Sequence, residues 1–148
     1  MNQKRERGMQ LVELAIVLPV VMALMAAIAE FGNYFYTYTT LAKATRAGAR
    51  YLSSKSFTGG EKDKARRIVV CGNPDSCASG TEILPGLTTG HIQVTSSGGT
   101  TYLPQTIRVS IAGYNYNSVF NLAGFGDGSS WLSVAVEPGT TMRYTLEN

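Results

Sequence analysis

The chain has 148 residues, which is room for one domain and an anchoring segment. Its charge is small, with 13 Lys and Arg residues against 10 Asp and Glu residues, a net of +3. So small a net charge gives no electrostatic footprint for nucleic acid, whose binding requires a clustered basic face. We therefore expect no nucleic acid among the partners. Glycine, serine and threonine are abundant after residue 53, which is typical of a loop-rich head containing β-strands.

A short basic leader precedes a long apolar run at the N-terminus. Residues 14–29 carry no charge and make about 24 Å of helix, short of the roughly 30 Å hydrocarbon core of a bilayer. Counting from Met9 gives about 31 Å, but this longer span includes Glu13. The bases before the run predict a cytoplasmic N-terminus and an exported head; they are Lys4, Arg5 and Arg7.

The helical pattern continues beyond the apolar run. Apolar and small residues recur at three- and four-residue steps as far as Leu52, and Lys43, Arg46 and Arg50 mark a polar face. The pattern predicts one helix over about residues 9–52, roughly 65 Å long. We expect its outer half to pack on the head and its inner half on neighbouring subunits. Residues 34–38 are rich in tyrosine, which suits either an aromatic belt at the membrane surface or core packing.

Pro19 lies inside this predicted helix. It removes one backbone hydrogen bond, to the carbonyl of Ala15. It is either a tolerated proline of a membrane helix or a point where the helix bends during assembly.

Two other interpretations of the N-terminus stay open. Residues 27–29 (Ala-Ile-Ala) fit the cleavage site of a secretory signal peptide, which would release a soluble protein beginning at Glu30. The run could also be an uncleaved single-pass anchor. The signal-peptide interpretation leaves Glu13 unexplained, because an acidic residue at the centre of a span costs roughly 2.5–3.5 kcal/mol, and less near an interface.

The segment after the long helix predicts a loop at 53–60 and a short helix at 61–70. This short helix carries four bases, which form either a solvated face or a surface for an acidic partner; they are Lys62, Lys64, Arg66 and Arg67. Cys71 and Cys77 follow, and in an exported domain such a pair predicts a disulfide. Two thiols and the distant His91 do not make a metal site, and we expect His91 to be a surface residue.

Four strands are expected in the remaining residues, at 92–96, 106–114, 131–137 and 140–146. Residues 114–127 should form a long loop or a short helix at 117–123, and the glycine-rich pieces at 97–99 and 124–128 should be turns. The predicted fold is α+β, with a small antiparallel sheet packed on the outer half of the long helix and Trp131 anchoring that packing. No catalytic constellation appears, so we expect neither an enzyme nor a cofactor.

Residues 7–52 resemble the TadE-like family, whose members are pilin-like components of the tight-adherence (Tad) systems that build Flp-type pili. The resemblance rests on Arg-Gly at 7–8, Leu-Val-Glu-Leu-Ala at 11–15, Val-Leu-Pro at 17–19, Ile-Ala-Glu-Phe-Gly at 28–32 and Ala-Thr-Arg-Ala-Gly-Ala-Arg-Tyr at 44–51. Residues 134–136 and 141–144 resemble the closing strand of that family. The chain is longer than major Flp pilins, and Leu14 stands where those carry tyrosine, so the resemblance favours an accessory or minor member.

The resemblance implies that a prepilin peptidase cuts after Gly8 and that Glu13 serves filament assembly. Cleavage would create an α-amine on Met9 at a helix N-terminus, where a positive charge opposes the helix dipole and a carboxylate complements it. Met9 and Glu13 are four residues apart and so share a face. Pairing of the amine with the carboxylate, within one subunit or between neighbours, would fix the axial register of a filament.

The resemblance also implies a division of the chain into a leader (1–8), a transmembrane and assembly helix (9–30) and a periplasmic or extracellular head (31–148). We expect a minor pilin or pseudopilin in the bacterial inner membrane or the extracellular pilus, acting in pilus biogenesis and adhesion. Its expected partners are the prepilin peptidase, accessory and major pilins, the inner-membrane assembly platform and membrane lipid. The alternative is a secreted or single-pass anchored binding or adhesive domain outside a pilus.

Overall fold

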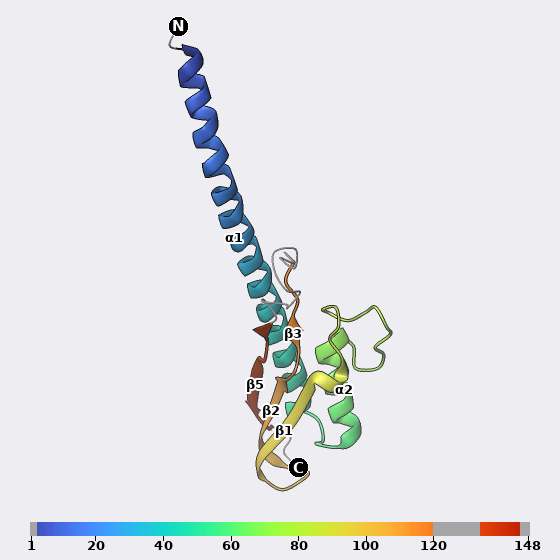
Figure 1. Ribbon diagram of the computed structural model, residues 1–148. Helices are drawn as coiled ribbons and strands as arrows, with labels where there is room; N and C mark the ends of the chain where they lie inside the picture. Colours follow the sequence, from blue (N-terminus) through green and yellow to red (C-terminus); the bar gives the residue numbers. More distant parts are fainter. Residues whose placement is uncertain (1–2, 120–133, 146–148) are drawn as a thin grey trace.

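The computed structural model describes residues 3–119 and 134–145, with side chains from residue 8 onward. A long N-terminal helix, α1 (Gln3–Ser53), spans about 76 Å, and its second half packs on a small head (Figure 1). This arrangement confirms the predicted α+β class. The helix begins at Gln3 rather than at residue 9, because residues 4–7 are good helix formers and Gly8 costs only about 1 kcal/mol relative to alanine. α1 also continues through Pro19 without a break.

The second helix, α2 (Gly59–Cys71), crosses α1 closely and confirms the predicted short helix. Gly48 lies at the crossing, where an added β-carbon would stand 2.5 Å from Cγ2 of Val69 and 3.2 Å from the carbonyl oxygen of Ala65. The helix ends at Gly72, which has a φ of 73° and donates its N–H to the carbonyl of Ile68.

A three-stranded antiparallel sheet covers the other side of α1. Its order is β1 (Ile92–Gly99), β2 (Pro104–Ile111) and β5 (Gly139–Arg143), and a three-residue turn, η1 (Thr89–His91), leads into β1. The register pairs Val94 with Val109 and Val109 with Thr140. A smaller two-stranded ladder joins β3 (Asn115–Tyr116) to β4 (Val134–Ala135).

Several predicted strand limits need correction. β2 ends at Ile111 rather than at residue 114, and the chain bends at Gly113, which has a φ of 73°. Residues 97–99 belong to the end of β1 rather than to a turn, although Gly98 and Gly99 have φ values of 69° and 71°. The turn itself is residues 100–103, closed by hydrogen bonds between Thr100 and Leu103.

The remaining predictions fall partly outside the described residues. Residues 117–119 are not helical, and the rest of the helix expected at 117–123 lies beyond the described part. Of the strand expected at 131–137, the structure describes Val134–Ala135 as β4. Trp131 and the turn expected at 124–128 also lie outside the described residues.

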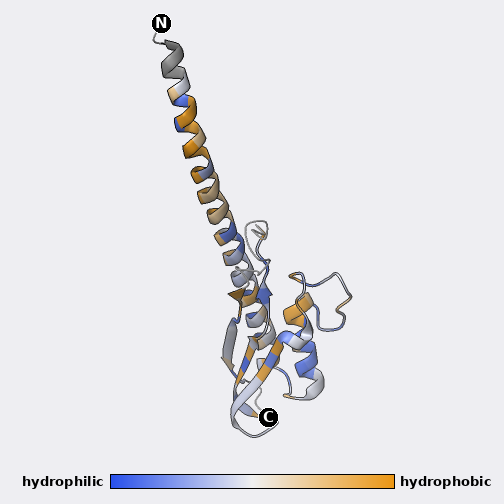
Figure 2. Cartoon of the chain, in the orientation of Figure 1, coloured by the Kyte–Doolittle hydropathy of each residue, from blue (hydrophilic) through white to orange (hydrophobic). Residues whose placement is uncertain are grey.

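The core lies between the sheet and the outer half of α1. β2 buries every second side chain, at Ile107, Val109 and Ile111, and α1 contributes Leu41 and Leu52. Each fully buried aliphatic side chain of this size stabilises the fold by about 1.5–3 kcal/mol. Figure 2 shows how hydropathy divides the chain: the part of α1 beyond the head is mostly hydrophobic, and the head mixes both kinds of residue.

Candidate membrane anchor and assembly site

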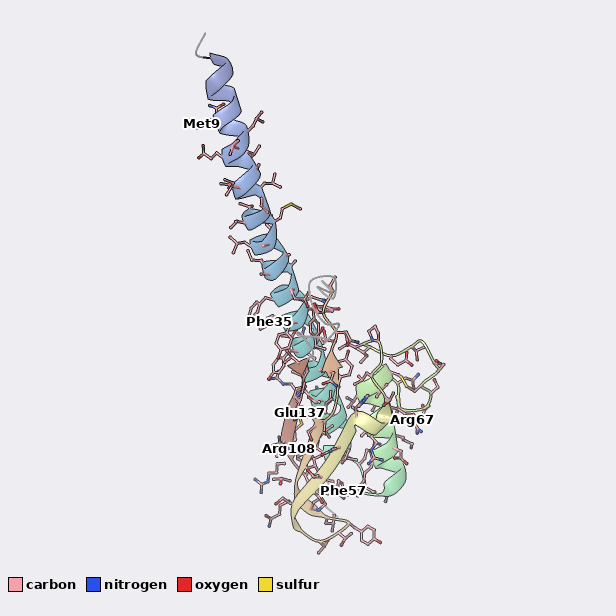
Figure 3. The ribbon with its side chains drawn as sticks, in the orientation of Figure 1. Met9, Phe35, Phe57, Arg67, Arg108 and Glu137 are labelled. Atoms are coloured by element: carbon pink, nitrogen blue, oxygen red, sulfur yellow. A yellow bond between two sulfur atoms is a disulfide. The ribbon has the colours of Figure 1, made fainter. Side chains whose placement is uncertain are left out.

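The N-terminal half of α1 is bare, in the sense that the described head does not cover it. From Met9 to Ile28 its large apolar side chains are all exposed, including Met9 at 76% and Ile28 at 71%. Among the described residues, α1 alone is long and apolar enough to cross a membrane by length and composition, and none of its most apolar stretch is buried. Met9 lies far from the head along this helix (Figure 3).

The three residues of the expected processing and assembly site lie on this bare stretch. A β-carbon on Gly8 would meet nothing within 4 Å, so no described part of the head covers this position. Glu13 is exposed, and no hydrogen bond or ion pair joins its carboxylate to another residue in the described ranges. The structure thus brings Gly8, Met9 and Glu13 together on an accessible segment, and their roles stay predictions.

In the described part of the chain, hydrogen bonds between α1 and the head begin at Glu30, one residue after the apolar run. The backbone N–H of Val119 donates to Oε2 of Glu30 at 3.1 Å. Nδ2 of Asn33 donates to the hydroxyl of Tyr116 at 2.8 Å, and the rings of Tyr34 and Tyr116 meet edge to face with centroids 5.5 Å apart. We call these five residues the collar. Burial, and then a hydrogen bond to the Glu30 carboxylate, raise the pKa of the Tyr116 hydroxyl.

The aromatic residues near the collar divide between the core and the surface, and the aromatic belt stays a prediction. Tyr34 packs on the core through Tyr116, whereas Phe35, Tyr36 and Tyr38 are 59%, 64% and 43% exposed. Phe31 is also 70% exposed. The sequence showed the aromatic character of this segment, but the choice between core and surface depends on a partner 82 residues away in the chain.

The basic cluster of α2 is engaged within the head. Each of its four bases has a local partner. Nζ of Lys62 lies 3.9 Å from the centre of the Phe57 ring, and Nε of Arg67 donates to the carbonyl of Pro74 at 2.7 Å. The other two form ion pairs within α2, Lys64 with Glu61 at 2.9 Å and Arg66 with Asp63 at 2.7 Å. These contacts favour the solvated-face interpretation over an acidic partner surface.

The predicted disulfide is confirmed. Cys71 and Cys77 are bonded, with their Cα atoms 5.6 Å apart, and they close a loop at the end of α2. The residues that the structure describes contain no group of three or more His, Cys, Asp or Glu side chains that could hold a metal ion. His91 has a local role that sequence reasoning missed, because its Nδ1 accepts the backbone N–H of Thr88 at 3.1 Å and so caps η1.

Comparison with known proteins finds a match that lies within α1. Residues 8–50 match the model of a family described as TadE-like protein. The chain carries a TadE-like segment. This segment is α1 from Gly8 to Arg50, so it includes the bare half, the collar residues of the helix and most of the surface on which the head packs. No curated protein and no solved structure matches the chain.

The TadE-like segment suggests a pilin-like protein associated with the Tad pilus. The TadE-like family is structural rather than enzymatic. Together with the single apolar helix, it indicates a membrane-anchored protein with one span.

Proposed function

We propose that this protein is a minor pilin or pseudopilin of a Tad (Flp-type) pilus assembly machine. A prepilin peptidase cuts it after Gly8, and the mature protein acts as a structural or priming subunit in pilus biogenesis and adhesion. The observation that carries this proposal is the bare apolar half of α1, which holds a single carboxylate, Glu13, five residues after an unshielded glycine.

The collar supports a particular depth for Glu13. Because Glu30 is held by the folded head, the hydrocarbon core should end near Ala29. Counting back about 30 Å at 1.5 Å per residue brings the inner boundary to about Gln10. Glu13 then lies about 24 Å from Ala29, roughly one helical turn inside the hydrocarbon. At that depth a carboxylate has lost most of its water and needs a partner.

Cleavage after Gly8 supplies that partner. The new α-amine of Met9 has an ordinary pKa near 8 and is positively charged at neutral pH. Met9 and Glu13 share a face of α1, and no side chain in the described part of the head contacts either. A pair formed between the amine of one subunit and the carboxylate of its neighbour would set the axial offset between adjacent helices in an assembly.

The position of Gly8 also suits the cut. Glycine inside a helix costs about 1 kcal/mol relative to alanine, so α1 opens locally more easily here than elsewhere in the leader. The bases before Gly8 keep the leader on the cytoplasmic side. The proposed partners are the prepilin peptidase, accessory and major pilins and the inner-membrane assembly platform, with the head in the periplasm or in the extracellular pilus.

Replacing Glu13 by alanine tests the assembly role. We expect Glu13→Ala to insert and to be cleaved like the wild type, because both steps depend on the leader and the apolar run. An alanine should even lower the insertion cost. The variant should accumulate as mature membrane protein, while crosslinking to pilin partners and pilus output fall severalfold.

Gln10→Ala provides the matched control, because it removes a polar side chain from the same stretch without removing the charge. It should leave crosslinking and piliation unchanged. Normal crosslinks and normal pili from Glu13→Ala would show that Glu13 is merely tolerated in the span.

A further inference from the structure

The outward face of the three-stranded sheet is polar and carries two free positive charges. Because Ile107, Val109 and Ile111 of β2 point into the core, the alternate side chains of β2 point away from the helices. The register extends this face across the sheet in rows: Thr95, Arg108 and Thr141 form one, and Ser97, Thr106 and Arg143 form the next. We call this surface the arginine face.

Among the residues that the structure describes, no acidic side chain pairs with either arginine. Arg108 and Arg143 are exposed and occupy diagonal positions on neighbouring strands, about 7–8 Å apart at the backbone. In the described ranges neither forms an ion pair within 4.0 Å. Glu137, labelled in Figure 3, precedes β5 by two residues, and its carboxylate accepts the backbone N–H of Gly113 at 3.4 Å.

The guanidinium of Arg108 lies next to Gly139 of β5. Its Nη2 and Cζ atoms lie 3.1 Å and 3.4 Å from the position that a β-carbon on Gly139 would occupy. The missing side chain of Gly139 therefore leaves room for the guanidinium to lie across β5. A guanidinium is planar, and its pre-organised N–H groups lose less freedom per hydrogen bond to a carboxylate than a lysine ammonium does.

Membrane lipid is too far away to be the partner. Thr140 at the start of β5 meets Thr45 of α1 with their hydroxyl oxygens 3.1 Å apart. Thr45 stands 16 residues beyond Ala29, about 24 Å along the helix. That distance is about three Debye lengths at physiological salt, and it exceeds the thickness of the headgroup layer.

The composition of the face also argues against a protein partner. Protein interfaces centre on buried aromatic and apolar anchors, and the rows of Arg108 and Arg143 offer only hydroxyl and guanidinium side chains. A hydrated polymer that carries both carboxylates and hydroxyls complements such a surface. Guanidinium groups bind its carboxylates through paired hydrogen bonds, and the threonine and serine hydroxyls bind its hydroxyls.

We propose that the arginine face binds an acidic polysaccharide, one whose repeating sugars carry carboxylates. This contact lies on the head alone, so it does not depend on cleavage after Gly8 or on Glu13.

Binding of hexagalacturonate to the full-length protein in a neutral detergent tests this proposal. Titration calorimetry at low salt should detect binding that weakens as salt rises. The double variant Arg108→Gln/Arg143→Gln should bind at least about tenfold more weakly, because both charge-assisted pairs are lost. Gly139→Ala should also weaken binding severalfold, since its β-carbon displaces Arg108 without changing the charge. A thermal unfolding temperature equal to that of the wild type would show that each variant keeps the fold.

Arg50→Gln is the matched control, because it removes one exposed positive charge from the outer side of α1. It should bind like the wild type. The proposal is overturned if Arg50→Gln weakens binding as much as the double variant, if neutral maltohexaose binds equally well, or if hexagalacturonate does not bind at low salt. Tighter binding of poly-glutamate would instead identify an acidic protein as the partner.

Discussion

At the scale of single residues, one carboxylate links the two helices of the head. The hydroxyl of Tyr51, near the end of α1, donates to Oε2 of Glu61 in α2 at 2.7 Å, and Nζ of Lys64 donates to Oε1 at 2.9 Å. The hydrogen bond from Tyr51, followed by the one from Lys64, lowers the pKa of the Glu61 carboxyl below its ordinary 4.5. The same contacts raise the pKa values of the Tyr51 hydroxyl and of the Lys64 ammonium.

Removing the Tyr51 hydroxyl should therefore raise the pKa of Glu61. A lowered folded-state pKa stabilises the fold above the ordinary value, and that stabilisation is lost as the pH falls through the folded-state pKa. We expect Tyr51→Phe to move the Glu61 pKa toward 4.5, as measured by carbon NMR of the side-chain carboxyl during an acid titration. Tyr102→Phe, at a site 71% exposed, should leave it unchanged. The same Glu61 pKa in Tyr51→Phe and the wild type would contradict this assignment.

At the scale of elements, the crossing of α1 and α2 depends on Gly48. An alanine there would meet both the side chain of Val69 and the backbone oxygen of Ala65, and backbone yields little. We expect Gly48→Ala to lower the free energy of unfolding by about 1–3 kcal/mol, as overpacking in cores typically does. Thermal unfolding of the full chain in detergent measures the change.

Gly32→Ala is the control for this prediction, because it lies in the same helix with nothing within 4 Å of the added β-carbon. It should leave stability unchanged or raise it by up to about 1 kcal/mol through helix propensity. Equal stability of the two variants would show that the helices do not cross as closely as described.

The elements that sequence predicted are those with a local periodic signal. The alternation at Ile107, Val109 and Ile111 and the three- and four-residue steps of α1 each follow from neighbouring residues. The collar has no such signal, because Asn33 and Tyr116 are 83 residues apart and their hydrogen bond exists only in the folded chain. The charge-free run placed the outer end of the span near Ala29, but it gave no sign that Glu30 is held by the backbone of Val119, 89 residues away in the chain.

At the scale of the whole molecule, the two halves of α1 have different roles. Its outer half supplies the core of the head, with Leu41, Ala49 and Leu52 fully buried, and its inner half is bare and apolar. The collar marks the change between the two. Because α1 is one continuous helix, a movement of the head would be passed on to its apolar half.

The N-terminal sequence of the protein isolated from its native membranes tests the central claim most directly. Processing after Gly8 predicts a mature chain that begins at Met9. Gly8→Val should leave a precursor about eight residues longer, because a side chain at this position would crowd a peptidase site shaped for glycine. Gly32→Val, which leaves the leader intact, should be processed normally. A wild-type chain that begins at Glu30 would identify a secretory signal, and one that begins at Met1 would identify an uncleaved anchor; either result would contradict the pilin-like processing proposed for this chain.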